Sequence, residues 1–276
     1  MTAILICLMS ALTAQEEVSL HIIEGAVSDD NQWMPYFVFS ETETFDSSNA
    51  ILRFDVGTTV EFSITNHADF TCGFRIKDHG SIETIATGET KTLTVDFNTE
   101  GSFLYEDHTQ DHRALGLGSM IVVSDFSGPS YYGVFTEHCL DWITPIADGG
   151  PYDKRTYNPD AFTINGKGFP RTLHDSLAMI KGSVGDTIRI YMTNAGLMYH
   201  FPHFHGYHVK IIQSDQHPHY VGWMKDSFGM APGESVCVEL VPDKPGHFPM
   251  HNHNLVTTTV GGNYPGGMMM HMEIDE

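Results

Sequence analysis

The feature that most constrains the fold is an internal repeat. Three segments recur later in the chain in the same order and at nearly the same spacing. The matched segments are DVGTTVEFSITN (55–66) with SVGDTIRIYMTN (183–194), GET (88–90) with GES (233–235), and GSFLYEDH (101–108) with GHFPMHNH (246–253). Self-similarity of this length indicates that the chain holds two copies of one domain.

Each copy has the sequence pattern of β-strands. Ile188, Ile190 and Met192 alternate with polar or amphipathic residues, which is the period of a strand with one buried face. Residues 90–97 alternate in the same way, and glycine and proline interrupt the chain at strand-like intervals. No long segment has a helical period. The pattern therefore predicts an all-β fold of two tandem Greek-key β-sandwich domains.

Histidine is concentrated in the second copy, in the segments HFPHFH (200–205) and HNH (251–253). Residues two apart in a strand point to the same face, about 6.5–7 Å apart at Cα. His203 and His205 should therefore project together, as should His251 and His253. Two such pairs on neighbouring strands can surround one or two metal ions, and neutral imidazole suits copper, zinc, iron or nickel. The alternative is a relict site of hydrogen-bonded histidines.

Charge and the N-terminus limit the partners and the location. The formal net charge of −21 repels phosphate backbones, so nucleic acid is not expected as a partner. The apolar run at 4–12 is too short to span a bilayer and resembles the tail of a secretory signal cleaved near Ala14; a buried first strand is the alternative. No other segment is apolar enough for a membrane span. We expect a signal peptide at 1–14, domains at 15–147 and 148–276, and an exported protein, periplasmic or extracellular.

The histidine motifs resemble those of a known family. His-x-x-His-x-His-Gly at 200–206, Pro-Met-His-x-His at 249–253 and Gly-Gly-Met at 266–268 look like the last domain of multicopper oxidases. They are also similar to two-domain laccases and copper nitrite reductases. The resemblance covers roughly residues 50–276 and implies two cupredoxin-like domains that bind copper.

The resemblance also implies roles for individual residues. His200 matches a ligand of the blue (type 1) copper, and Met268 matches its axial ligand. The ligands of the type 2 and type 3 coppers are matched by His203, His205, His251 and His253. In the first domain His108 matches a retained cluster ligand, and Glu106 stands where the family has histidine, so it is a candidate carboxylate ligand and proton donor.

The departures from the family pattern are as informative. Asn252 replaces the cysteine of the blue copper, and Thr257 replaces its second histidine, so we expect no functional blue copper. The first-domain His-x-His-Gly aligns with Phe70-Thr71-Cys72-Gly73, which has lost both histidines. Asp107 stands where the nitrite-reductase pattern would have its cysteine.

These observations leave three functional hypotheses. The first is a copper oxidoreductase with a reduced histidine centre, which takes electrons directly from a small-molecule reductant and reacts with oxygen or another small oxidant. The second is a non-catalytic copper-binding protein for storage or delivery in the cell envelope. The third is a zinc-binding protein on the same scaffold. The family resemblance further implies a homotrimer, in which His108 and Glu106 meet the four histidines across a subunit contact.

Overall fold

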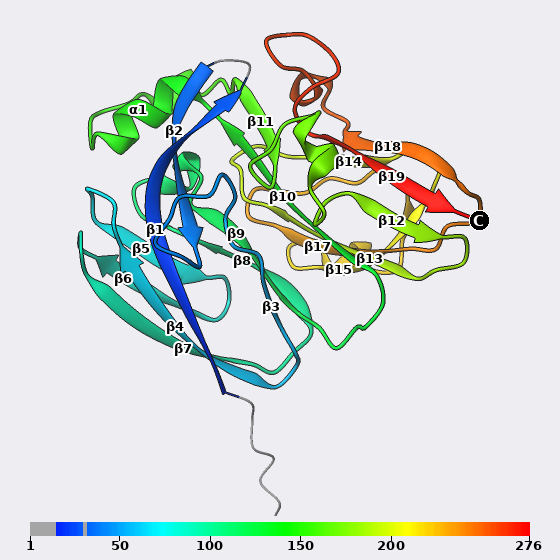
Figure 1. The fold of residues 1–276 in the computed structure, drawn as a ribbon, viewed down its shortest axis with the longest axis horizontal. Coiled ribbons are helices and arrows are strands. Elements are labelled where there is room, and N and C mark those ends of the chain that lie inside the picture. The colour runs from blue at the N-terminus through cyan, green and yellow to red at the C-terminus, as the bar shows by residue number, and fades with distance from the viewer. Residues whose placement is uncertain (1–14, 30–31) are drawn as a thin grey trace, which may run out of the picture.

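The computed structural model describes residues 15–29 and 32–276; the predicted signal peptide at 1–14 lies outside the described residues. Two β-sandwiches lie next to each other, and each contains one half of the chain's repeat (Figure 1). The predicted all-β fold of tandem sandwiches is confirmed. In the described part of the chain, no helix is long and apolar enough to cross a membrane.

The first sandwich is built from two sheets, with strand orders β2-β1-β4-β7 and β3-β9-β8-β5-β6. Its strands are β1 (Gln15–Asp29), β2 (Gln32–Ser40), β3 (Leu52–Phe54), β4 (Thr58–Asn66), β5 (Cys72–Ile76), β6 (Gly80–Ile85), β7 (Thr90–Phe97), β8 (Gly101–Glu106) and β9 (Gly118–Val123).

The second sandwich pairs a sheet of order β11-β10-β13-β17-β15-β16 with a sheet of order β12-β19-β18-β14. Its strands are β10 (Ser130–His138), β11 (Ala161–Ile164), β12 (Ile180–Ser183), β13 (Ile188–Asn194), β14 (Pro202–Phe204), β15 (Val209–Ser214), β16 (Met224–Lys225), β17 (Ser235–Leu240), β18 (Gly246–Asn252) and β19 (Met269–Asp275).

The helices are short and lie outside the sheets. They are α1 (Leu140–Ala147) and the 3-10 turns η1 (His112–Leu115), η2 (Lys154–Thr156), η3 (Arg171–His174), η4 (Pro218–Tyr220) and η5 (Leu255–Thr258). The segment that connects the two sandwiches contacts both of them. β10 hydrogen-bonds to β13 in the second sandwich, whereas Trp142, Ile143 and Ile146 of α1 pack into the first core. The domain boundary at 147/148 stays a prediction.

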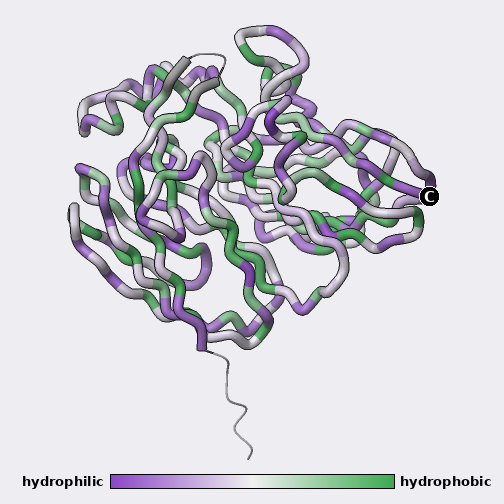
Figure 2. The backbone as a smooth tube through the Cα atoms, in the orientation of Figure 1, coloured by the Kyte–Doolittle hydropathy of each residue, from purple (hydrophilic) through white to green (hydrophobic). Residues whose placement is uncertain are grey.

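Each sandwich has its own core, because alternate side chains of its strands face inward. β4 alternates between buried and half-buried side chains along its whole length, and apolar and polar residues alternate along most strands in Figure 2. A third cluster, which includes Leu104, Met120, Tyr132, Tyr191 and Cys237, draws on strands of both sandwiches. This apolar contact fixes one domain against the other.

A candidate metal centre

Two short strands bring the four predicted histidines together. β14 and β18 are antiparallel neighbours, and their register places His203 opposite His251. His205 and His253 follow one residue beyond the two strand ends. The ring centroid of His203 lies 4.7 Å from that of His205, 4.9 Å from that of His253 and 5.5 Å from that of His251. We call these four side chains the histidine quartet.

Backbone carbonyls orient two of the quartet rings. The Nδ1 atom of His203 lies 3.1 Å from the carbonyl oxygen of Asp226, and that of His251 lies 2.9 Å from the carbonyl oxygen of Asn252. A carbonyl only accepts, so each Nδ1 carries the proton and donates it, and each Nε2 keeps a lone pair. The lone pair of His251 faces Nε2 of His205 at 2.9 Å. Metal-ligating histidines in proteins are commonly oriented this way.

The quartet rings are closely spaced and partly exposed. The Nε2 atoms of His205 and His251 are 2.9 Å apart. Burial lowers the pKa of both imidazoles, and the other quartet rings lower it further. His251 is buried, whereas His205 and His253 are exposed. Neutral imidazole is the metal-binding form, so the donor chemistry fits copper or zinc.

The quartet nitrogens are not yet gathered around one point. In the part of the chain that the structure describes, the one trio whose candidate donor atoms all lie within 4.8 Å of each other is elsewhere, at Cys72, Asp107 and His112. A metal ion at the quartet therefore requires small rotations of the imidazole rings, which the exposure of His205 and His253 allows.

The side chain of Asn252 occupies the centre of the predicted blue-copper position. Its Nδ2 atom donates to Nδ1 of His200 at 2.8 Å and to the sulfur of Met268 at 3.4 Å. All three residues are fully buried. The two side chains that match blue-copper ligands are thus already joined by hydrogen bonds through the amide that replaces the family's cysteine.

The other nitrogen of His200 is held by Glu137, which the sequence patterns did not single out. Because Nδ1 accepts from Asn252, Nε2 carries the proton and donates to Glu137 at 2.7 Å. Burial raises the pKa of Glu137, but hydrogen bonds from His200, Tyr157 and the N–H of Leu197 outweigh burial and lower it to about 2. Glu137 is the residue before the last in the buried strand β10, and no local motif marks such a carboxylate.

The first-domain candidates do not join the quartet within the chain. The carboxylate of Glu106 is buried and pairs with Arg75 and with Arg113, the latter at 2.9 Å. His108 lies 3.4 Å from the exposed Glu83. The roles predicted for Glu106 and His108 as ligand or proton donor stay predictions.

The strand register shows which first-domain residues correspond to the quartet. β5 pairs with β8 as β14 pairs with β18, and Arg75 opposes Glu106 where His203 opposes His251. The expected alignment of Phe70-Thr71-Cys72-Gly73 with His-x-His-Gly is therefore displaced: Cys72 occupies the position of His200. The reason is that the segment from the first repeat (55–66) to Cys72 has the same length as the segment from its second-domain copy (183–194) to His200. The sequence did not reveal this correspondence, because the first domain has none of the matching histidines to align.

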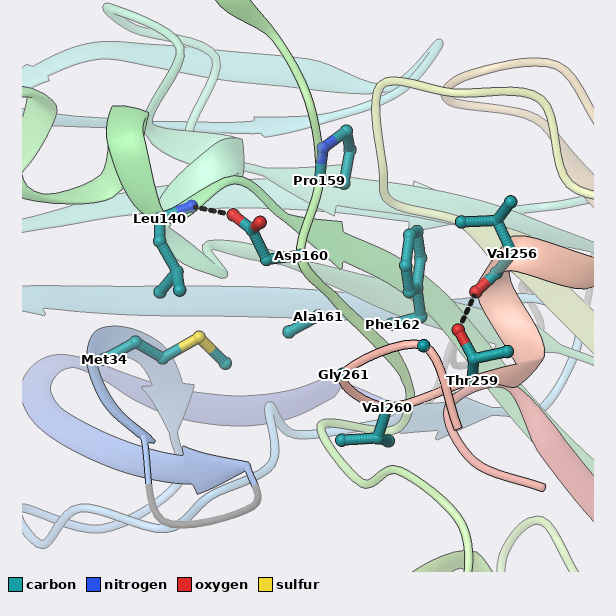
Figure 3. A pocket seen from close by; sticks show the side chains of 11 residues that line it. Met34, Leu140, Pro159, Asp160, Ala161, Phe162, Val256, Thr259, Val260 and Gly261 are labelled. Atoms are coloured by element: carbon teal, nitrogen blue, oxygen red, sulfur yellow. Dashed lines mark hydrogen bonds between the residues drawn. The ribbon is translucent and has the colours of Figure 1, made fainter. Parts of the chain in front are cut away.

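One pocket lies beside the segment that follows the quartet. It is lined by Met34, Leu140, Asp160 and Phe162 on one side and by Val256–Gly262 on the other, and none of its 11 lining residues is a histidine (Figure 3). Asp160 accepts a hydrogen bond from the N–H of Leu140 at 3.1 Å. Most of the lining side chains are apolar, and Asp160 is the one ionisable residue among them.

Comparison with known proteins finds sequence similarity in the second half of the chain and structural similarity over both domains. Residues 150–276 match a family model described as multicopper oxidase. The match covers slightly less than half of the chain, and this part is therefore similar to multicopper oxidases. Among curated proteins, multicopper oxidase MmcO of Mycobacterium tuberculosis is 32% identical over 112 residues, which are 40% of this chain and 19% of that protein. The match thus spans about a fifth of the relative's length.

Solved structures extend the likeness over both domains. A blue copper oxidase from Nitrosomonas europaea superposes with a TM-score of 0.79 at 22% identity, over 94% of this chain and 86% of that one. A copper nitrite reductase from Nitrosomonas europaea gives 0.74 at 19% identity, over 95% and 94%. The chain therefore has the tandem cupredoxin-like fold of these proteins, and residues 150–276 match the multicopper oxidase family model.

Proposed function

We propose that the protein binds copper at the histidine quartet and acts as an oxidoreductase with a reduced copper centre and no blue copper. The observation that carries this is the orientation of His203 and His251. Their Nδ1 atoms are held by carbonyls, so each Nε2 atom carries a lone pair that can ligate, that of His251 once its contact with His205 opens. Bound copper would supply one-electron redox chemistry at this site. The chain's own residues orient the rings and keep them neutral.

The rest of the proposal concerns location, partners and assembly. The protein is exported, to the periplasm or the extracellular space, and takes a small-molecule reductant together with oxygen. It forms a homotrimer in which a second copy completes the quartet. Leu255 and Val256, which follow His253, are 65% and 64% exposed; apolar exposure of this size beside a half-open ligand cluster supports a subunit contact there.

Storage or delivery of copper is the second candidate function. The hydrogen bonds of Asn252 to His200 and Met268 favour it, because they fill the position through which electrons would enter a blue-copper enzyme. Turnover separates the two functions. Oxygen uptake with a phenol or Cu(I) as donor is expected of the enzyme, and tight binding without uptake is expected of the storage protein.

The test is metal analysis of the full chain after expression without added copper, followed by titration with Cu(II) and Zn(II). The wild type should bind copper, and a His203→Ala, His251→Ala double variant should lose that binding. A His217→Ala, His219→Ala variant is the matched control, because it removes two histidines at the turn η4, which are not members of the quartet. Equal copper binding by the wild type and the quartet variant would contradict the proposal, and preferred uptake of zinc over copper would replace copper with zinc.

A further inference from the structure

The first domain contains a second buried cluster of metal-type donors, which the proposed function does not use. Cys72, Asp107 and His112 are at most 1% exposed, and their donor atoms all lie within 4.8 Å of one another. They come from the start of β5, from the residue after β8 and from the start of η1. Thiolate, carboxylate and imidazole are the three side-chain donors that zinc takes in proteins.

The repeat places this cluster in the first-domain equivalent of the pocket around Asn252. Cys72 pairs with Ile85 in the first domain as His200 pairs with Met230 in the second. In both domains an asparagine at the end of the preceding strand donates from its side chain to the carbonyl of that partner. The thiol of Cys72 therefore stands where the second domain has an imidazole.

Asp107 is the counterpart of Asn252. The backbone N–H of Asp107 donates to Leu117, and that of Asn252 donates to Met268. In each domain one side-chain oxygen accepts the N–H of the residue that follows the thiol or imidazole. The two pockets thus share a backbone frame, but the second is closed by a neutral amide and the first by an acid.

We propose that Cys72, Asp107 and His112, hereafter the first-domain trio, bind one divalent ion of the zinc type. A thiolate and a carboxylate carry two negative charges, so a dication with a neutral imidazole gives a site without net charge. Such a site suits a pocket that excludes water. On binding, the S–H bond of Cys72 breaks, a metal–sulfur bond forms and one proton leaves to solvent, with no change of oxidation state.

The geometry requires only a small adjustment. Oδ2 of Asp107 and Nδ1 of His112 are 2.7 Å apart, whereas donors on a tetrahedral zinc ion lie about 3.3 Å apart. The pair must therefore open by roughly half an ångström, and His112 must move its proton from Nδ1 to Nε2. The thiol of Cys72 makes weak hydrogen bonds to Asn66 at 3.4 Å and to Phe70 at 3.8 Å, and it also interacts with Asp107, so its sulfur already faces another member of the trio.

Cobalt titration of the reduced, metal-free full chain tests this site without depending on the quartet. Thiolate bound to Co(II) gives a near-ultraviolet charge-transfer band, and the quartet contains no sulfur. We expect the band to saturate with one equivalent of Co(II) and to disappear when Zn(II) is added. Absence of the band in the wild type overturns the proposal, whatever the quartet binds.

Variants identify the ligands. Cys72→Ser should abolish the band, whereas Cys139→Ser and Cys237→Ser should keep it, because those buried thiols lie outside the trio. Asp107→Asn copies the residue found in the second domain, so it should fold, and it should weaken Co(II) binding at least about tenfold. A band that survives Cys72→Ser, or an affinity unchanged by Asp107→Asn, shows that the trio is not the site.

Discussion

The two domains use one backbone arrangement to hold opposite chemistries. On β14 and β18, His203 opposes His251, and both rings keep an unprotonated Nε2 that can bind metal. On β5 and β8, the same register opposes Arg75 and Glu106, which form an ion pair. A guanidinium cannot ligate a metal, and its pairing occupies the carboxylate. The fold thus decides which side chains meet, and the residue types decide whether they can bind an ion.

The buried pockets around Asn252 and Asp107 differ in the opposite way: here the first domain, not the second, has the metal-type donors. In the second domain the amide of Asn252 joins His200 and Met268 and closes the pocket. In the first domain, Asp107 and Cys72 keep the donor chemistry that the second-domain pocket has given up. Each domain therefore retains one candidate site and has lost the other.

The largest expected effect comes from returning a thiol to the closed pocket. Asn252→Cys should give a copper-loaded protein with strong visible thiolate-to-copper absorption, where the wild type has none, because His200 and Met268 already converge on that position. The absorption spectrum with Cu(II) measures this. Asn252→Ser opens the same space without a thiol and should stay colourless; a colourless Asn252→Cys protein would mean that the pocket is no longer a copper site.

Replacing Asp107 or its counterpart Asn252 with alanine should lower the free energy of unfolding by different amounts. In the metal-free protein Asp107→Ala should lower the free energy of unfolding by about 4 kcal/mol, because it removes a buried charge and leaves several donors unpaired. Asn252→Ala should cost about 2 kcal/mol, since it removes a neutral amide. Urea denaturation of both variants gives the comparison. Equal losses would show that charge does not distinguish the two pockets.

Acid should loosen the second domain through Glu137. Its folded-state pKa is lowered to about 2, so its stabilisation is complete above the unfolded-state value near 4.3 and is lost as the pH falls toward 2. The full loss, about 3 kcal/mol, is reached only below pH 2, and a little more than half of it should appear by pH 3. Unfolding free energies measured between pH 6 and pH 3 should fall less steeply in Glu137→Gln. If both proteins lose stability in parallel, other carboxylates account for the acid sensitivity.

The smallest effect is expected at the first-domain ion pair. Arg75→Met should cost no more than about 1 kcal/mol, because the Arg75 side chain is 48% exposed and Arg113 still pairs with Glu106. The copper content should not change, since this pair only corresponds to the quartet in register. Thermal denaturation and metal analysis of one preparation measure both. Loss of copper from Arg75→Met would show that the first-domain strands also contribute to the metal centre.

Much of this arrangement follows from patterns that the sequence displays directly. The repeat and the period of two residues were sufficient to predict two β-sandwiches. The spacing of His203 with His205 was sufficient to predict that their rings lie close together, although His205 lies beyond the end of β14. The correspondence of Cys72 with His200 was missed because the matching histidines of the first domain are gone. Extending the two repeat registers by a few residues would have aligned Cys72, Asp107 and His112 with the second-domain pocket.

The sequence by itself determined the fold, the repeat and the face on which the quartet gathers, because strand periodicity and motif spacing are local properties of a chain. Only the tertiary structure decided the partners of the buried polar groups. Asn252 with His200, Glu137 with His200, and Asp107 with His112 are joined by contacts between separate strands and loops. Hydrogen-bond geometry depends on how whole sheets and turns are packed, and no local pattern records it.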